Sequence, residues 1–544
     1  MIFIKKHFLI TILVLLSFFP VVTLLAPGLP VTHDGQDHVA RIANFYQSLQ
    51  DGNIIPRWAA NLNWEYGHPI LMFLYPLPSY LASFMHFLGF NLVDSVKLVF
   101  GISFILSGLA MYLWMKSEIG KMEGFFAAFL YMFAPYRFVD FYVRGAIGEH
   151  MAFVFPPLIF YFLHKLRNSS SSLYLVFGSL SVAGLILSHN AVSLMFIPII
   201  FLYIFYGARF SKNKKVFLLQ AIMMILWGFL LSAFFWIPAL FEGKYTLRDI
   251  VTKNEYATRF VQLKDLLYGE WNYGGTGQFT VQIGVVQWIM VSISVLLLIV
   301  KKNRKYVLPM VGLLTIFIIT LFLMLPISDI IWQKITLLQK FQFPWRLLSV
   351  EVFVTAVLGA LVIAQIKHKK YVVIASVILG LILLRPAWQA DGYLLRSESF
   401  YSGIYYSTTD TGESSPIWSI RFMEHTPRAH IEVIDGEAMV QEVSRLSTSH
   451  VYKVNAVKNS RIRENTVYFP GWTVFVNGKP VPVEFQDQAN RGLITFFVDK
   501  GESMIEVKFI DTKIRYFSNI VSFLAFISMI LYLFYNRKIW RVFR

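Results

Sequence analysis

Two acidic residues follow directly after the first apolar stretch, and their side chains are well placed to do chemistry. Residues 8–32 carry no charge, and Asp34 and Asp37 come next, followed by His38 and Arg41. On a helix that begins near Asp34, these spacings would put all four side chains on one face. The positive end of that helix would favour ionised carboxylates, which could deprotonate a hydroxyl group or bind a divalent cation. The alternative is a helix-capping Asp with a surface salt bridge.

A second charged group lies about a hundred residues further on, between two apolar stretches, and contains Arg137, Asp140, Arg144 and Glu149. Acids and arginines at a membrane boundary usually pair with each other or extend toward water. That alternative stays open, above all for Arg137. Asp140, Arg144 and Glu149 are candidate site residues because they lie where the first group could reach them.

Two further positions place polar side chains beside apolar runs. His189 interrupts an apolar hairpin, where a single histidine is more often a polar cap than a ligand. Arg346 follows Phe343-Pro344-Trp345 at the start of another apolar run. An arginine beneath aromatic rings suits a phosphate or pyrophosphate at headgroup depth. An interfacial aromatic belt with an extended arginine is the alternative.

Several kinds of site are excluded by the sequence. The chain has no cysteine, which rules out disulfides, thiolate metal sites and cysteine nucleophiles. The glycine-rich stretch 273–277 lacks the Lys-Ser/Thr pair of a phosphate-binding loop. Neither an HExxH zinc motif nor a GxSxG nucleophile elbow is present.

The composition indicates a polytopic membrane protein. Of 544 residues, 56% are hydrophobic and only 15% are charged, and the mean hydropathy is +0.56. The net charge of +17 does not indicate nucleic-acid binding, because of its distribution. Residues 386–514 hold 13 Lys and Arg against 16 Asp and Glu, a net −3, so the rest of the chain carries +20.

That positive charge lies in short clusters between apolar runs, which marks the cytoplasmic side of a membrane protein. The clusters are Lys5-Lys6, 164–167, 209–215, 301–305, 367–370 and 537–544. We therefore expect a multi-pass protein of the cell (plasma) membrane with both termini in the cytoplasm. The first span is expected to be a retained anchor, because Ala26-Pro27-Gly28 suits signal-peptide cleavage badly.

About twelve transmembrane helices are expected from the apolar runs. They lie near 8–29, 95–115, 123–138, 147–164, 173–188, 190–207, 216–240, 280–300, 306–326, 346–366, 371–386 and 516–535. The stretch 70–90 is expected to lie along the outer surface, because Pro76 and Pro78 break it. The helical module then covers 1–386, with a first outer loop at 30–94, and 515–544 form the last helix and a basic tail.

Residues 387–514 are expected to form a separate domain outside the membrane. Alternating strands are predicted at 466–469 and 473–476, with a turn at Asn477-Gly478 leading into 481–485. Two further strands are predicted at 494–498 and 504–510, so an antiparallel β-sandwich is the expected fold.

Taken together, these residues resemble the first outer loop of GT-C-fold membrane glycosyltransferases. The resemblance is carried by Asp34, His38, Arg41, Gly52, Pro56-Arg57-Trp58, Gly67-His68-Pro69 and Tyr75-Pro76-Leu77-Pro78. Within that class the chain is most similar to the bacterial and archaeal "6-pyruvoyl-tetrahydropterin synthase-related" membrane proteins, with a relation to the YfhO-like group. The narrower likeness rests on 343–346, 468–472 and Asn477-Gly478-Lys479. Nothing in the sequence indicates a soluble zinc enzyme acting on pterins.

The resemblance implies an inverting glycosyltransferase. Its donor would be a sugar on a polyprenyl phosphate in the lipid bilayer, and its acceptor a cell-envelope glycan, lipid or polymer on the outer face. Asp34 matches the catalytic acidic residue, with Asp37 as its deputy. Because Gly35-Gln36 separates them where family members often have adjacent acids, the identity of the base stays open.

The remaining roles also follow from the resemblance. Asp140, Glu149 and Arg144 would form the second-loop acid and donor-binding group; Arg346, Trp345 and His189 would bind the lipid phosphate; and His38, Arg41, Arg57 and Trp58 would support the acceptor or the loop. No cofactor is certain, and a divalent cation, Mg²⁺ or Mn²⁺, would be held by Asp34 and Glu149 if one binds.

Two other function classes remain as alternatives. A transporter or flippase for lipid or polysaccharide would need ionisable residues at mid-membrane depth. The candidate spans 281–300 and 346–366 offer almost none beyond Glu351. A non-catalytic scaffold for envelope assembly is the other alternative, and the acidic pair argues mildly against it.

Overall fold

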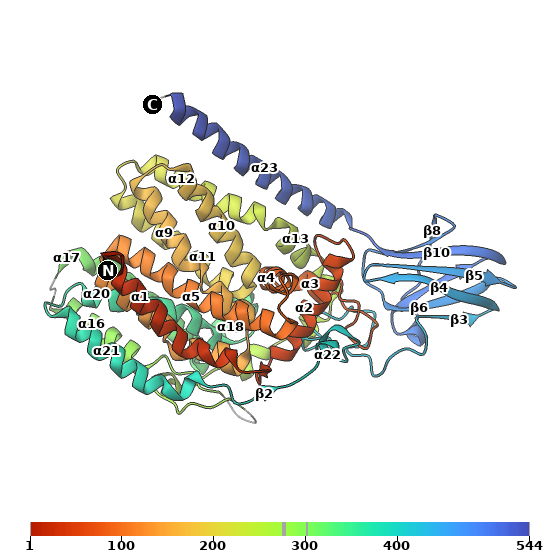
Figure 1. Ribbon diagram of the computed structural model, residues 1–544, viewed down its shortest axis with the longest axis horizontal. Coiled ribbons are helices and arrows are strands. Elements are labelled where there is room, and N and C mark those ends of the chain that lie inside the picture. Colours follow the sequence, from red (N-terminus) through yellow and green to blue (C-terminus); the bar gives the residue numbers. More distant parts are fainter. Residues whose placement is uncertain (1, 275–278, 301–302, 543–544) are drawn as a thin grey trace.

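The computed structural model describes residues 2–274, 279–300 and 303–542, and the side chains of 8–535 within these ranges. Most of the predicted glycine-rich stretch, the start of the basic cluster at 301 and the side chains of Lys5-Lys6 and of the C-terminal basic cluster lie outside the described residues. The molecule consists of a helical bundle with a β-domain at one end of it (Figure 1).

Eight helical segments of the described chain are long and apolar enough to cross a membrane. They belong to α1 (Ile2–Val21), α5 (Leu92–Glu118), α11 (Asn190–Phe210), α12 (Lys214–Leu231), α17 (Arg304–Met324), α20 (Leu348–Ile363), α21 (Lys369–Leu384) and α23 (Lys513–Val542). The other four expected spans correspond to shorter helices, which are α6 (Lys121–Met132), α9 (Phe155–Asn168), α10 (Ser172–Ser188) and α16 (Val285–Ile299). The predicted class, a polytopic helical protein with a C-terminal antiparallel β-domain, is confirmed.

The centre of the bundle is formed by α20 and α6. Every residue of the apolar segment Pro344–Ile363 is buried, as expected for a helix that is hydrophobic on all sides. Gly359 lets the two helices approach closely, because a Cβ there would lie 2.3 Å from the Leu130 side chain. Two parts of the site described below belong to or follow this pair. Ser349 lies on α20, and the second charged group follows α6 in the sequence.

The first outer loop is built from short helices on the side of the bundle that faces the β-domain (Figure 1). Its elements are α2 (Gly35–Gln50), α3 (Ile70–Phe73) and α4 (Leu77–Phe87). The break at Pro76 divides the apolar stretch 70–90 as predicted, and neither piece is long enough to span a bilayer.

Short helices connect the longer ones. They are α7 (Pro135–Phe138), α8 (Ile147–Ala152), α13 (Ala233–Phe241), α14 (Arg248–Val251), α15 (Leu263–Leu267), α18 (Asp329–Lys334) and α19 (Thr336–Gln339). The expected single span 216–240 is divided at Ser232 into α12 and α13. Between α7 and α8, residues Val139–Arg144 form a π-helical turn, a wide turn that is common at functional sites.

The β-domain is a sandwich of two antiparallel sheets. One sheet has the order β4 (Ala438–Leu446), β5 (Ser449–Ala456), β10 (Gly501–Phe509), β7 (Trp472–Val476) and β8 (Lys479–Val481). The other has the order β3 (Ile431–Asp435), β6 (Ser460–Val467) and β9 (Leu493–Val498). The predicted hairpin is present, because Val476 pairs with Lys479 across Asn477-Gly478, both of which have positive φ.

The sandwich begins later than the sequence indicates, at Ile431 instead of residue 387. The preceding residues belong to the bundle: β2 (Tyr393–Leu394) pairs with β1 (Leu29–Pro30), directly before the first acidic group. Residues 395–424, which we call the strap, contain only the short helix α22 (Glu398–Ser402) and run along the first outer loop. The strap was not predicted, because it has no hydrophobic periodicity.

Candidate active site

Asp34 stands at the N-terminus of α2 with its carboxylate unpaired. Its backbone N–H donates to the Arg144 carbonyl at 2.9 Å, which joins the two charged groups of the sequence. The side chain is half-buried and does not cap the helix; the Thr32 hydroxyl accepts from the Gly35 N–H instead, at 3.1 Å. Among the described side chains none donates to the Asp34 carboxylate, so the capping alternative does not explain this residue, and the carboxylate is free to accept a proton.

Asp37 lies one turn further along α2 and has a partner from the strap. The Tyr405 hydroxyl donates to its Oδ1 at 3.1 Å. Burial raises the pKa of the Asp37 carboxyl, and the negative charges of Asp34 and Asp410 act in the same direction, while Arg41 and Tyr405 oppose them. The two acids therefore differ in environment, because a hydroxyl donates to Asp37 and no described side chain donates to Asp34.

His38 and Arg41 form a buried pair on the inner face of α2. The Arg41 Nη1 lies 3.1 Å from the His38 Nδ1, and the Arg41 Nε donates to the Thr409 hydroxyl at 2.8 Å. Burial, followed by the charge of Arg41, holds the pKa of His38 well below its usual value, so the ring is neutral. Because arginine only donates, Nδ1 is an acceptor and the ring proton is on Nε2, which has no partner among the described residues.

The second charged group is a compact network around Glu149. Its Oε1 accepts from the hydroxyls of Tyr136 and Ser349, each at 2.7 Å. Its Oε2 lies 2.8 Å from the Arg144 Nη1 and 3.3 Å from the Arg346 Nε. Asp140 pairs with Arg144 as well, at 2.5 Å. The buried acids Asp140 and Glu149 thus pair with the buried arginines Arg144 and Arg346. This network is the one described by the alternative in which acids and arginines at a membrane boundary pair with each other.

Aromatic rings hold both arginines in place. The Arg144 guanidinium lies over the Trp345 ring, 4.8 Å from its centre, and Arg346 lies over Phe343 at 4.9 Å. Trp345 and Phe343 stack on each other with centres 4.9 Å apart, and Phe279 packs edge-on against Trp345. This arrangement fixes two cations at the N-terminal end of α20.

Tyr75 lies where the two groups meet. Burial raises the pKa of its hydroxyl to about 12, and the charges of Arg41, Asp34, Arg346 and Arg144 all act on it. The ring packs against Gly148, where a Cβ would lie 1.9 Å from a ring carbon. Asp34 and Arg346, which the sequence singled out, therefore both act on Tyr75. In the sequence this tyrosine was notable only for the prolines that follow it.

The other candidate residues have structural contacts. The His189 Nδ1 accepts from the Val192 N–H at 3.2 Å, so this histidine caps α11 as expected of a lone histidine. Arg57 pairs with Asp511 at 2.8 Å and donates to Asn519, and Trp58 is buried edge-on against Trp472. Arg57 and Trp58 support the first outer loop by fastening it to the β-domain and to α23.

Glu149 does not suit the metal-binding role considered for it. Its two oxygens already face four donors, two hydroxyls and two guanidinium groups, so no lone pair is directed toward a cation. Within the described ranges, no three His, Asp or Glu side chains converge in a way that could hold a metal ion. We derive no step through a metal.

Three strap residues complete the site and were missed by the sequence reasoning. They are Tyr405, which donates to Asp37, Thr409, which accepts from Arg41, and Asp410, whose negative charge acts on Asp37. Thr409 has a φ of +65°, a left-handed conformation that a β-branched residue rarely adopts. This strained residue is the one whose hydroxyl accepts from Arg41. No sequence signal indicated this contact, which spans 368 residues.

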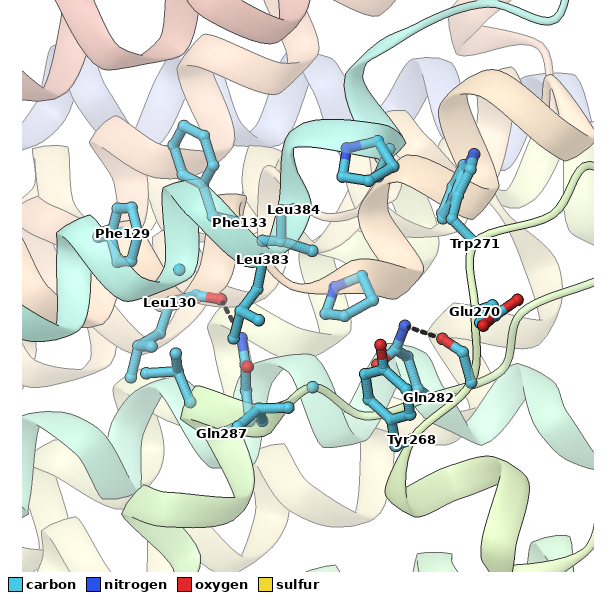
Figure 2. A pocket seen from close by; sticks show the side chains of 18 residues that line it. Phe129, Leu130, Phe133, Tyr268, Glu270, Trp271, Gln282, Gln287, Leu383 and Leu384 are labelled. Carbon is cyan, nitrogen blue, oxygen red and sulfur yellow. Dashed lines mark hydrogen bonds between the residues drawn. The ribbon is translucent and has the colours of Figure 1, made fainter.

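The larger of two described cavities lies beside these groups and contains neither Asp34 nor Arg346 in its lining. It has a volume of about 280 Å³ and lies among α6, α16, α21 and the loop that precedes α16 (Figure 2). Apolar side chains such as Phe129 and Leu384 line one part, and Glu270, Gln282 and Trp271 line another. The same loop reaches the first acidic group, because the Tyr273 carbonyl lies 3.3 Å from the His33 Nε2.

A known family matches the central part of the chain. Its model is described as "6-pyruvoyl-tetrahydropterin synthase related domain; membrane protein" and covers residues 71–391, more than half of the sequence. The chain belongs to this family. The match includes the Glu149 network and Tyr75, and it stops before the strap and the β-sandwich. Membership confirms the family expected from the sequence.

Part of the chain is also similar in sequence to an individual protein. An uncharacterized protein of Lactococcus lactis subsp. cremoris (strain MG1363) is 26% identical over 243 residues, which are 42% of this chain and 39% of that protein. The chain thus spans about two fifths of that relative.

Among solved structures, the apo oligosaccharyltransferase of Archaeoglobus fulgidus aligns with a TM-score of 0.43 at 13% identity, over 76% of this chain and 61% of that one. The mycobacterial arabinofuranosyltransferase AftD aligns with a TM-score of 0.45 at 12% identity, over 70% of this chain and 26% of that one.

Proposed function

We propose that this protein is an integral-membrane, inverting glycosyltransferase. It transfers a sugar from a polyprenyl-phosphate donor to a glycan, lipid or polymer acceptor at the outer face of the cell membrane. The observation that carries the proposal is the unpaired Asp34 carboxylate at the start of α2. Its charge acts on Tyr75 together with the charges of Arg41, Arg144 and Arg346. The resemblance of the first outer loop to GT-C glycosyltransferases supports the same assignment.

The reaction needs a base on one side of the sugar and positive charge on the other. The acceptor oxygen attacks the anomeric carbon, its proton passes to a carboxylate, and the bond from that carbon to the phosphate oxygen breaks with both electrons staying on the phosphate. The nucleophile enters opposite to the leaving group, so the anomeric configuration inverts. Arg41 supplies positive charge near the departing phosphate, and Arg144 and Arg346 supply further guanidinium N–H groups on that side.

Asp34 suits the role of base better than Asp37 does. The Asp37 carboxyl has a raised pKa and an oxygen occupied by Tyr405, whereas the Asp34 carboxylate has no donor bound to it within the described chain. Two acids in different environments can divide the work, one ionised and one positioning. Asp37 then orients the segment through Tyr405.

The membrane topology follows from the same proposal. The outer face holds the first outer loop, the strap and the β-sandwich, and both termini lie in the cytoplasm, as the distribution of Lys and Arg indicates. The cavity of Figure 2 is bordered by apolar helices beside this site, which suits the chain of a lipid donor. A polyprenyl carrier cannot leave the bilayer, so its enzyme must act at the membrane surface.

Turnover of a radiolabelled polyprenyl-phosphate sugar by the purified protein tests the proposal. We expect Asp34→Asn to abolish transfer while thermal unfolding stays unchanged, because the side chain is half-exposed and makes no described contact. Asp391→Asn is the matched control, since it removes an exposed outer carboxylate elsewhere. Normal transfer by the Asp34 variant would refute the assignment of the base, and absence of turnover by the wild-type protein with every polyprenyl sugar offered would refute the activity.

A further inference from the structure

The second described cavity lies between α2 and the α3–α4 turn, and Arg41 is part of its lining. Its lining includes His38, Arg41, Tyr75, Pro76, Ser79 and Ile147. The volume is about 10 Å³, the space of one water or one oxygen atom. Seven of its eleven lining residues are apolar, and the other four provide an imidazole, a guanidinium, a phenol and an aliphatic hydroxyl.

His38, which lines this cavity, has a buried donor without a partner among the described residues. The residue is 5% exposed, and its Nε2 has no hydrogen-bond partner among the described residues. Since Arg41 donates to Nδ1, the neutral ring carries its proton on Nε2. A buried N–H without a partner costs free energy, and such groups are rare unless a ligand or water completes them.

Arg41 differs from the other two arginines around Tyr75 in its charge balance. Arg144 and Arg346 are neutralised by Asp140 and Glu149. Arg41 makes no ion pair with a described carboxylate, and its hydrogen bonds go to the neutral His38 and to Thr409. At 8% exposure, it is a largely buried cation without a counter-ion in contact.

The geometry points to an oxyanion site formed by His38, Arg41 and Tyr75, which takes one phosphate oxygen of the donor. The inference rests on the proposed function and assigns the phosphate contact to α2, in place of the balanced arginines of the second group. The Arg41 charge and the His38 N–H supply two charge-assisted bonds, and Thr409 positions the guanidinium from the strap. The positive charge of Arg41 in the lining disfavours a cation at this site.

Binding of undecaprenyl phosphate to the full-length protein in detergent tests the inference, with undecaprenol and inorganic phosphate as comparison ligands. We expect Arg41→Gln and His38→Leu each to weaken undecaprenyl phosphate binding roughly ten- to a hundredfold. Undecaprenol, which lacks the phosphate, should bind the variants and the wild type equally. If inorganic phosphate also binds and is lost in the variants, the site recognises phosphate itself; if only the lipid binds, the headgroup needs its chain.

Two variants separate ligand binding from folding. His38→Gln keeps an N–H donor near the Nε2 position and should retain most of the affinity that His38→Leu loses. Arg491→Gln removes an exposed arginine of the β-domain and should change nothing. Unchanged undecaprenyl phosphate binding in Arg41→Gln, or equal loss of undecaprenol and undecaprenyl phosphate, would overturn the inference.

The outcome for the proposed function is read separately. Asp34→Asn should bind undecaprenyl phosphate like the wild type and fail only in sugar transfer. If Asp34→Asn still transfers sugar, the proposed base fails and the phosphate site stands on its binding data. If Asp34→Asn is inactive and Arg41→Gln binds normally, the phosphate site fails and the proposed function survives.

Discussion

The Tyr405 hydroxyl donates to the Asp37 Oδ1 at 3.1 Å across 368 residues of sequence. This bond fastens the strap to the helix that carries both candidate acids. It also provides a means to decide which acid is the base, because Tyr405 contacts one carboxylate and not the other.

Replacing Tyr405 with Phe removes this bond and leaves the ring in place. The hydrogen bond lowers the pKa of Asp37, so its loss raises that pKa further. If Asp37 had to be ionised for transfer, the acid limb of the pH–rate profile would move to higher pH in the variant. We expect the limb to stay where it is, because Asp34 is the proposed base. Polyprenyl-sugar turnover measured from pH 4 to pH 9 provides the profile, and a shifted limb would assign the base to Asp37.

Local sequence patterns predicted the regular elements of this fold well. Apolar runs gave the long helices, Pro76 gave the break between α3 and α4, and Asn477-Gly478 gave the β7–β8 hairpin. Each of these depends on interactions within about twenty residues, for which composition and turn chemistry are sufficient. The strands β3, β4 and β5 and most of β6 were missed, and in β4 an exposed face and a bulge obscure the alternation.

The site was only partly predictable, because many of its contacts are not local. The sequence singled out Asp34, Arg144, Glu149 and Arg346 by residue type at the ends of apolar runs. It could not show that Glu149 binds both arginines, nor that Arg41 makes no ion pair with a described carboxylate. Such pairings are tertiary contacts between segments up to 200 residues apart, and the strap adds contacts over longer separations that have no local signature.

Glu149 is expected to be the most sensitive residue of the second charged group. Glu149→Gln removes the negative charge between Arg144 and Arg346, which leaves Arg346 without an ion-pair partner among the described residues and Arg144 with Asp140 alone. Breaking a buried ion pair in this way costs about 3–5 kcal/mol. Ser349→Ala removes one neutral donor from the same carboxylate and should cost about 1 kcal/mol. Thermal unfolding in detergent measures both, and equal effects would show that the charge balance does not matter.

Gly148 is predicted to be irreplaceable because of Tyr75. A Cβ there would lie 1.9 Å from the Tyr75 ring and 2.6 Å from the Ser188 carbonyl oxygen. Gly148→Ala should therefore displace the ring, destabilise the protein by about 1–3 kcal/mol and reduce sugar transfer. Gly312 in α17 is the matched control, since no atom lies within 4 Å of its Cβ position. Gly312→Ala should be neutral or stabilising by up to about 1 kcal/mol, and similar losses in both variants would contradict the steric argument.

His430 should make the attachment of the β-domain dependent on pH. It lies 3.3 Å from Glu65 of the first outer loop and 2.7 Å from Glu442 of β4. The hydrogen bond to Glu65 raises the pKa of His430 above its usual 6.5, although burial and Arg445 oppose the shift. Asn63, Trp64 and Glu65 all have positive φ, so this contact also holds a strained turn in place.

The sign of the effect follows from the raised pKa. A histidine that binds its proton more tightly in the folded state contributes stability that is fully present below pH 6.5 and is lost as the pH rises through the folded-state pKa. Hydrogen exchange at residues 60–67 should therefore accelerate as the pH rises above 6.5, beyond the intrinsic dependence of exchange on pH. His430→Gln should remove that extra dependence, whereas Lys453→Gln, which breaks an exposed pair within the sandwich, should leave it intact. Equal acceleration in the wild type and in His430→Gln would show that another group controls the attachment.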